Sequence, residues 1–256
     1  MKFPILSLLT CALFSASVVR AENHPLKESF SQSGTFSSTG KITLENINGD
    51  IEVETWDKNE ISIEGQKSAR TEEELKLIDL KIDRSESRVD IKVHLPKRKG
   101  GMFGNSSIRG GVSFKLKVPV NTNLERIKTV NSSINIAGIR GPVDAETVNG
   151  NIRAQNLGGS ARLSSVNGGL RASFARVAAQ QELSFDTVNG SIEVILPENA
   201  GAEVRSQVVN GHIDCEFPIE SQGGRVSGKR LAGKIGDGRA ALSAESVNGG
   251  VRIKRS

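Results

Sequence analysis

Few residues in this 256-residue chain have the types and spacing that catalysis or metal binding requires. The three histidines, His24, His94 and His212, lie in no HExxH or Cys/His pattern, and the chain has no nucleophile elbow or phosphate-binding loop. Carboxylates are numerous but scattered, whereas a glycosidase needs two of them facing one cleft. We therefore expect no catalytic residue, no cofactor and no metal; a polysaccharide-active enzyme is the remaining enzymatic alternative.

The most unusual segment runs from Lys97 to Gly111 and is basic, glycine-rich and free of acidic residues. Its cations are Lys97, Arg98, Lys99 and Arg109. A basic finger of this kind fits an anionic partner such as lipid headgroups, lipopolysaccharide phosphates or an acidic polysaccharide. The alternative is a solvated hairpin loop without a partner. Nucleic acid is not expected, because the run is short, aromatic residues make up 4% of the chain and tyrosine is absent.

An internal repeat, aliphatic-Asn-Gly-x-aliphatic, organises the chain that carries these residues. From the second repeat onward its asparagines are 18, 18, 22, 21 and 38 residues apart. The last gap is close to two periods, so we expect the segment from Leu231 to Gly238 to hold a rung that has lost its Asn-Gly corner. The corner asparagines are Asn48, Asn131, Asn149, Asn167, Asn189, Asn210 and Asn248.

The residues around each corner alternate as in β-strands. Positions three and five after each asparagine are apolar and share one face, as do Ile152 and Ala154. Cys215 occupies one of these inward positions, so we expect it to act as a small buried apolar residue and not as a reactive thiol. The residues between the inward positions must face water; they are Glu52, Asn135, Arg153, Arg171, Glu193, Asp214 and Arg252.

Two architectures fit this pattern. Asn-Gly between alternating strands is a strong hairpin signal and would give an antiparallel meander. Regular spacing of nearly identical corners instead favours the stacked rungs of a β-solenoid, with the asparagines forming a ladder. We favour the solenoid, because a long meander would leave one face and both edges uncovered. Asn and Gly are expected at the corners because both tolerate positive φ.

The N-terminus has the layout of a secretory signal peptide. A positive start precedes an apolar run from Phe3 to Val19, and we expect cleavage after Ala21, which makes residues 1–21 the signal. The rival interpretations are an uncleaved anchor, because the run is about 17 residues long, and a lipoprotein acylated at Cys11. Cleavage removes two cations and lowers the net charge from +5 to +3. No second apolar run follows, so we expect no transmembrane span after cleavage.

The remaining segments are not part of the repeat. Residues 22–40 are expected to form a flexible lead-in, and residues 41–256 a single domain. In that domain we expect an extra strand at 60–64, a hairpin of residues 80–82 and 89–93, and a strand at 112–118. The sequence from Thr71 to Glu74 has the form of a capping box and predicts one or two helical turns.

The stretches from Thr43 to Val53 and from Glu146 to Ile152 resemble the signature and the repeats of the DUF4097 family of adhesin-like proteins. The resemblance extends over roughly residues 35–256. It implies a right-handed β-helix-like domain outside the cytoplasm, and related domains occur in bacterial surface proteins and in envelope-stress sensing systems. The family supplies no catalytic residues, and residues 97–111 look like an insertion in its pattern.

The sequence therefore predicts an all-β protein, a right-handed β-helix or β-solenoid repeat domain with a short helix and a β-hairpin insertion near its N-terminal part. We expect an exported, non-enzymatic protein of the periplasm or cell surface. Its expected activity is that of an adhesin-like module or scaffold that binds anionic envelope polymers or lipid headgroups. The alternative is an accessory or sensor protein of an envelope-stress system that acts through a protein partner.

Overall fold

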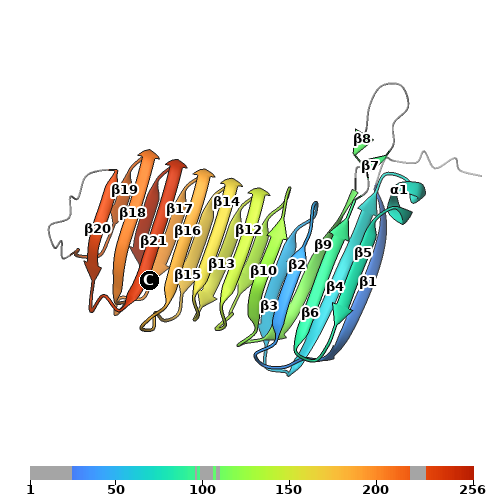
Figure 1. Cartoon of the computed structure of the whole chain (residues 1–256), viewed down its shortest axis with the longest axis horizontal. Coiled ribbons are helices and arrows are strands. Elements are labelled where there is room, and N and C mark those ends of the chain that lie inside the picture. The colour runs from blue at the N-terminus through green and yellow to red at the C-terminus, as the bar shows by residue number, and fades with distance from the viewer. Residues whose placement is uncertain (1–24, 96, 99–105, 108–109, 220–228) are drawn as a thin grey trace, which may run out of the picture.

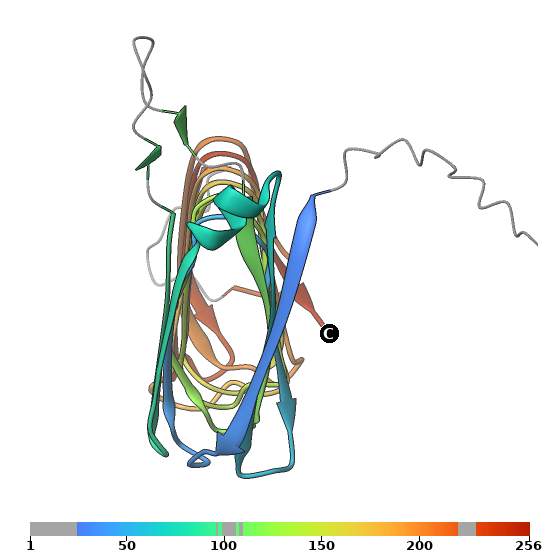
Figure 2. The same cartoon turned by 90° about the vertical axis from the view of Figure 1, so that its right-hand side faces the viewer.

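The computed structural model of the chain describes residues 25–95, 97–98, 106–107, 110–219 and 229–256. They form a long, flattened β-solenoid whose two sheets face each other across a narrow core (Figure 1 and Figure 2). Each sheet has ten strands, and one pair of two-residue strands stands apart from both sheets. Within these ranges, no helix combines the length and the apolar character that crossing a membrane requires.

In both sheets the spatial order of the strands differs from their order in the chain. Sheet A consists, from one edge to the other, of β1 (Leu26–Thr35), β4 (Glu60–Ala69), β9 (Gly110–Pro119), β3 (Ile51–Trp56), β11 (Ile134–Ala137), β13 (Ile152–Leu157), β15 (Leu170–Phe174), β17 (Ile192–Leu196), β22 (Val251–Arg255) and β19 (Ile213–Cys215). Sheet B consists of β20 (Arg230–Ile235), β18 (Ala202–Asn210), β21 (Ala240–Asn248), β16 (Glu182–Asn189), β14 (Ala161–Asn167), β12 (Val143–Asn149), β10 (Asn123–Thr129), β2 (Lys41–Glu45), β6 (Arg88–His94) and β5 (Asp79–Arg84). The other elements are α1 (Glu72–Lys76), β7 (Lys97–Arg98) and β8 (Ser106–Ser107).

Each repeat contributes one strand to each sheet, and the strands of neighbouring repeats pair in parallel. In sheet A, Ile134 is the register partner of Ile152, which is in turn the partner of Leu170. All three side chains are buried, so equivalent positions stack into apolar columns along the core. The predicted all-β solenoid is confirmed, and the alternative of an antiparallel meander is wrong.

Close packing between rungs explains the corner glycines better than backbone φ does. Of the corner glycines, only Gly49 and Gly249 have φ in the left-handed region, at 114° and 157°. A Cβ on Gly150, Gly168 or Gly190 would lie only 1.8–2.0 Å from the carbonyl oxygen of the neighbouring rung. The expectation that Asn and Gly serve here through positive φ is therefore wrong for most corners, because the stacked backbone leaves no room for a side chain.

A buried hydroxyl two residues before the asparagine closes the corner. Thr147 Oγ1, for example, donates a hydrogen bond of 3.0 Å to the carbonyl of Ser132 in the neighbouring rung. This bond links two rungs and gives a partner to a polar group inside the core. The hydroxyl donors that make an equivalent 3.0 Å bond are Thr147, Ser165, Thr187 and Ser246.

The corner asparagines form a continuous ladder of side-chain hydrogen bonds along one edge of the solenoid. Each Nδ2 donates to the Oδ1 of the next asparagine at 2.7–2.9 Å, so all the bonds point in the same direction. At the end of the ladder Asn48 Nδ2 donates to the carbonyl of Gly110 at 2.8 Å. The predicted asparagine ladder is confirmed; its order is Asn210, Asn248, Asn189, Asn167, Asn149, Asn131 and Asn48.

This order differs from the order in the chain because the last repeat is inserted between two earlier ones. Strand β21 lies between β16 and β18, and β22 lies between β17 and β19. The rung expected from Leu231 to Gly238 is wrong, because β20 runs antiparallel to β18 as the edge strand of sheet B. Gly236 and Gly238, with φ of 56° and 68°, then turn the chain back into the gap.

The first repeat is inserted in the same way at the other end. Strand β2 lies between β6 and β10, and β3 lies between β9 and β11, so β6 and β9 form the outermost parallel rung. Strand β5 covers one edge as the antiparallel partner of β6, which confirms the predicted hairpin. Helix α1 is also confirmed: the Oγ1 of its N-cap Thr71 accepts a 3.1 Å hydrogen bond from the Glu74 amide.

Strand β1 corrects the expectation that residues 22–40 are a flexible lead-in. It pairs with β4 over its full length, and its one aromatic ring, Phe30, lies over Gly65 and contacts Phe114 edge-on at a centroid distance of 6.0 Å. At the end of the solenoid the backbone ladder supplies most of the interactions. One large aromatic side chain is therefore enough to pack this strand against the sheet. For this reason its serine-rich sequence lacks the alternating apolar pattern that predicts a strand.

The outermost rung, β6 and β9, has a different corner from the others. Between these two strands the chain contains the short antiparallel strands β7 and β8, with Lys97 paired to Ser107. The insertion in the basic segment thus replaces an Asn-Gly corner next to the end of the asparagine ladder, where Asn48 bonds to the Gly110 carbonyl. Figure 1 shows β7 and β8 at this end of the solenoid.

Candidate functional surface

The residues singled out in the sequence do not gather into one site. Lys97 and Arg98 form β7, whereas Lys99 and Arg109 lie outside the described residues, as does the expected signal at residues 1–21. The binding role of the four cations therefore stays a prediction. Among the residues that the structure describes, no three His, Cys, Asp or Glu side chains are placed to hold a metal ion.

Cys215 faces inward from β19 as the register partner of the buried Ile253. Its Sγ lies 3.8 Å from the carbonyl oxygen of Phe217, and burial raises the pKa of the thiol. A raised pKa lowers the thiolate fraction at neutral pH and makes the sulfur less nucleophilic. This agrees with the inert role expected from the repeat.

Sheet A carries a row of arginines on its outer face. Arg153 of β13 and Arg171 of β15 are register partners, and Glu193 of β17 separates them from Arg252 of β22. We call Arg153, Arg171 and Arg252 the arginine row. All three side chains are exposed, and the next register partner after Arg252 is Asp214 of β19. The sequence predicted that each of these residues faces water, and their single line follows from the parallel register.

Glu193 is the carboxylate within the row and is already engaged by cations. Arg171 contacts its Oε1, and Lys254 Nζ lies 3.0 Å from its Oε2. Burial raises the pKa of Glu193, but the hydrogen bond from Lys254 and the charges of Arg171 and Arg252 outweigh burial and lower it. No carboxylate in the described ranges lies within 4.0 Å of the guanidinium of Arg153 or Arg252. These two arginines are therefore available to a ligand.

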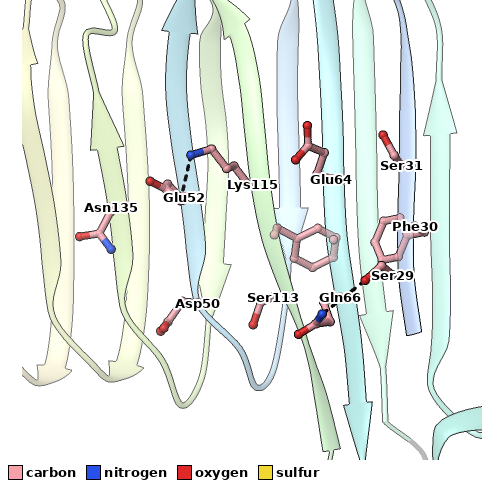
Figure 3. A pocket seen from close by; sticks show the side chains of 12 residues that line it. Ser29, Phe30, Ser31, Asp50, Glu52, Glu64, Gln66, Ser113, Lys115 and Asn135 are labelled. Carbon is pink, nitrogen blue, oxygen red and sulfur yellow. Dashed lines mark hydrogen bonds and ion pairs between the residues drawn. The ribbon is translucent and has the colours of Figure 1, made fainter. Parts of the chain in front are cut away.

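A hollow of about 770 Å³ lies further along the outer face of sheet A, over β1, β4, β9, β3 and β11 (Figure 3). Its charged lining residues are three carboxylates and one ammonium group, and its other polar groups are amides and hydroxyls. We call it the sheet A hollow. Its polar side chains are Ser29, Ser31, Asp50, Glu52, Glu64, Gln66, Ser113, Lys115 and Asn135.

The cation of the hollow is neutralised within the protein. Lys115 Nζ lies 3.2 Å from Glu54 and 3.6 Å from Glu52, and its interactions with Glu54 and Glu52 raise the pKa of its ammonium. Asp50 accepts a hydrogen bond from the Ser133 amide at 3.0 Å, and Glu64 is exposed. These carboxylates lie at the surface beside amides and hydroxyls, an arrangement that suits hydrogen bonding.

The hollow and the arginine row belong to one line of register partners. Lys115 pairs with Glu52, Glu52 with Asn135, and Asn135 with Arg153, the first member of the arginine row. Neighbouring strands are about 4.8 Å apart, so Asn135 at the border of the hollow lies roughly that far from Arg153 along the sheet. One ligand can thus contact both features.

Sheet B presents different chemistry on its outer face. A groove of about 330 Å³ on this face is lined by carboxylates and by the valines that directly precede the corner asparagines. These valines are 40–49% exposed; they are Val166, Val188, Val209 and Val247. The carboxylates include Asp186 and Glu245, which are register partners on β16 and β21. These carboxylates disfavour an anionic ligand in this groove.

The hollow could not be found from the sequence. Its lining comes from separate strands, around Ser29, Asp50, Glu64, Ser113 and Asn135, and the strand order at this end is not the chain order. The sequence did predict that Glu52, Asn135 and Arg153 face water, and this was the one available indication of the hollow. It identified the face but not the neighbours across it.

Residues 142–254 match the family model described as Toastrack DUF4097, which confirms the expected resemblance over this part of the chain. No curated protein matches the chain. Several solved structures are similar to this chain, including the following three. A "putative cell adhesion protein" from Clostridium sporogenes ATCC 15579 is 13% identical, with 91% of this chain and 100% of that chain covered and a TM-score of 0.49. A "putative adhesin" from Bacteroides fragilis NCTC 9343 is 11% identical, with 90% and 98% covered and a TM-score of 0.42. A "putative lipid binding protein" from Parabacteroides distasonis ATCC 8503 is 18% identical, with 89% and 96% covered and a TM-score of 0.30.

Proposed function

We propose that the protein is an exported, non-enzymatic, adhesin-like scaffold of the cell envelope or surface that binds anionic polymers along sheet A. The observation that carries this proposal is the arginine row. Arg153 and Arg171 stand on neighbouring strands about 4.8 Å apart, and Arg252 stands two strand intervals beyond Arg171. The parallel ladder fixes these spacings, so they do not depend on flexible loops. A polymer with repeating anionic groups suits such a fixed line of cations.

The energetics of the row support a binding role. Arg153 and Arg171 are direct register partners, and like charges on neighbouring strands oppose each other and destabilise a sheet. Glu193 compensates on one side of Arg171 only. An anionic group over Arg153 would relieve this repulsion and gain charge-assisted hydrogen bonds, which are stronger than bonds between neutral groups.

The basic segment is a second contact in this proposal. Lys97 and Arg98 form β7 at the corner of the outermost rung, and Lys99 and Arg109 belong to the same basic segment of the sequence. A basic segment at this corner would engage polymer that leaves sheet A over the edge beside β9. In this role it adds avidity to the row and does not replace it.

Co-sedimentation with peptidoglycan, lipopolysaccharide and anionic vesicles at low and high salt tests the proposal. The test variant is Arg153→Ser/Arg252→Ser, and the matched control is Arg162→Ser/Arg230→Ser, which removes two exposed arginines from sheet B. We expect binding that weakens with salt, because charges are screened over about 10 Å at 0.1 M. Binding should fall in the test variant and persist in the control. The proposal fails if no anionic material is retained by the native chain.

A further inference from the structure

The sheet A hollow differs chemically from the arginine row that it adjoins. The row offers cations to anions, whereas the hollow has an excess of carboxylates and an ammonium group that Glu54 and Glu52 already bind. An anionic group placed in the hollow would meet Asp50 and Glu64 without a free cation to offset them. The hollow therefore does not extend the polyanion site.

The polar side chains of the hollow are of the kinds that form hydrogen bonds with hydroxyl groups. Carboxylates accept hydrogen bonds, amides such as Gln66 and Asn135 both donate and accept, and serine hydroxyls do either. Figure 3 shows these side chains lying over the same face, with Gln66 bonded to Ser29 and Glu52 to Lys115. A ligand with many hydroxyl groups and no negative charge matches this set.

The sheet A hollow and the arginine row lie on one unbroken line of register partners. A ligand that fits both must therefore match each along that line. From Lys115 to Arg252 the line of partners crosses six strand intervals, or roughly 29 Å at the usual strand spacing. A nucleic acid or an anionic lipid surface would place charge uniformly along this line, against the carboxylates of the hollow. A chain with both uncharged and acidic units can place each kind over its own partner.

We propose that the ligand is a polysaccharide that contains both neutral and acidic sugars. A neutral, hydroxyl-rich sugar occupies the sheet A hollow, and the acidic groups of the same chain lie over the arginine row. This inference rests on the proposed function and specifies its ligand class. Asn135 lies between the hollow, which holds the neutral sugar, and Arg153, the first cation of the row.

Two soluble polysaccharides of matched length test this inference with the full protein. Polygalacturonate carries an acid on every sugar, and hyaluronan alternates acidic and neutral sugars. Electrostatics alone predicts tighter binding of polygalacturonate, which has the higher charge density. The hollow predicts the reverse, with hyaluronan binding at least about fivefold more tightly, because its neutral sugars can hydrogen-bond to the carboxylates and amides of the hollow, whereas every sugar of polygalacturonate brings a negative charge to them.

Two variants locate the preference, and their folding is checked by thermal unfolding. Glu64→Ala/Gln66→Ala should remove the preference for hyaluronan and leave polygalacturonate binding unchanged or tighter. Arg153→Ser/Arg252→Ser should weaken binding of both charged polymers. Equal affinity for the two polymers, tighter binding of polygalacturonate, or an unchanged preference in the hollow variant would overturn the inference and leave the proposed function standing. Absence of binding to either charged polymer would instead reject the proposed function.

Discussion

Asn248 Nδ2 donates a 2.7 Å hydrogen bond to Asn189 Oδ1, although the two residues are 59 positions apart and Asn210 lies between them in the sequence. Asn210 in turn donates to Asn248 at 2.9 Å. The last repeat thus fills a gap between two earlier rungs and continues their ladder. The corners of β16 and β21 present the same asparagine, glycine and buried hydroxyl, so a rung from the C-terminus fits this gap as well as a sequential one does.

A disulfide cross-link should report this rung order directly. Ser184 of β16 and Ser243 of β21 are register partners on the outer face of sheet B. Parallel neighbours have Cα atoms about 4.8 Å apart, inside the range that a disulfide spans. In a chain whose own cysteines are serine, Ser184→Cys/Ser243→Cys should oxidise to a cross-linked form with altered mobility on non-reducing gels.

The matched control for the cross-link is Ser184→Cys/Arg205→Cys. These positions are separated by β21, at roughly twice the strand spacing, and should not cross-link. If the rungs followed the order of the chain, Arg205 would be the neighbour of Ser184. Efficient cross-linking of the control pair would therefore contradict the inserted rung.

Two adjacent glycines should differ sharply in their tolerance of alanine. A Cβ on Gly168 would lie 1.8 Å from the carbonyl oxygen of Gly150, whereas the nearest atom to a Cβ on Gly169 is 3.4 Å away. We expect Gly168→Ala to lower the free energy of unfolding by about 3 kcal/mol or more, as overpacking against rigid backbone does. Gly169→Ala should change it by less than about 1 kcal/mol. Similar losses in urea unfolding of both variants would argue against close corner stacking.

The hydroxyl of Thr187 should contribute through its hydrogen bond and not through its shape. Its Oγ1 donates to the Gly168 carbonyl at 3.0 Å. In the rung of β18 the equivalent position is held by Val208, the register partner of Ser246 and itself buried, which shows that valine fits this slot. We expect Thr187→Val to cost about 1–2 kcal/mol of unfolding free energy in urea titrations. An unchanged or higher stability would mean that the hydroxyl is dispensable.

Asp144 should make the stability of the solenoid depend on pH in an unusual direction. Burial raises the pKa of its carboxyl, and the charge of Arg162 offsets this only in part. When a carboxyl has a higher pKa in the folded chain than in the unfolded chain, the folded state loses stability as the pH rises through the folded-state pKa. We therefore expect Asp144→Asn to unfold at a higher temperature than the native chain at about pH 7 and at nearly the same temperature at about pH 3. A variant that is less stable at about pH 7 would contradict this.

The repeat made the rungs, the inward columns and the asparagine ladder predictable, because each depends on spacing within a few residues. Cys215 and Arg153 were assigned to the correct faces for the same reason. The order of rungs was not predictable, since interchangeable corners do not encode which rung is adjacent. The edge strand β20 was mistaken for a rung because its length and apolar residues fit either role.

The functional surface was harder to predict than the fold. Strand β1 has one large aromatic residue, Phe30, and pairs mainly through its backbone, so no side-chain pattern predicts the strand. The hollow depends on this strand and on the insertion of β3 beside β9. The arginine row required the register of sheet A, which places Arg153 beside Arg171 although they are 18 residues apart.

The most direct test of the proposed function is the affinity of the protein for polygalacturonate at several salt concentrations, compared between two charge-matched variants. Arg153→Ser/Arg252→Ser removes cations from sheet A, and Arg162→Ser/Arg230→Ser removes the same charge from sheet B. We predict that the sheet A variant binds at least about tenfold more weakly with a shallower salt dependence, a loss of about 1.4 kcal/mol, and that the sheet B variant binds like the native chain. Equal weakening in both variants would mean that only net charge matters and would contradict a binding face on sheet A.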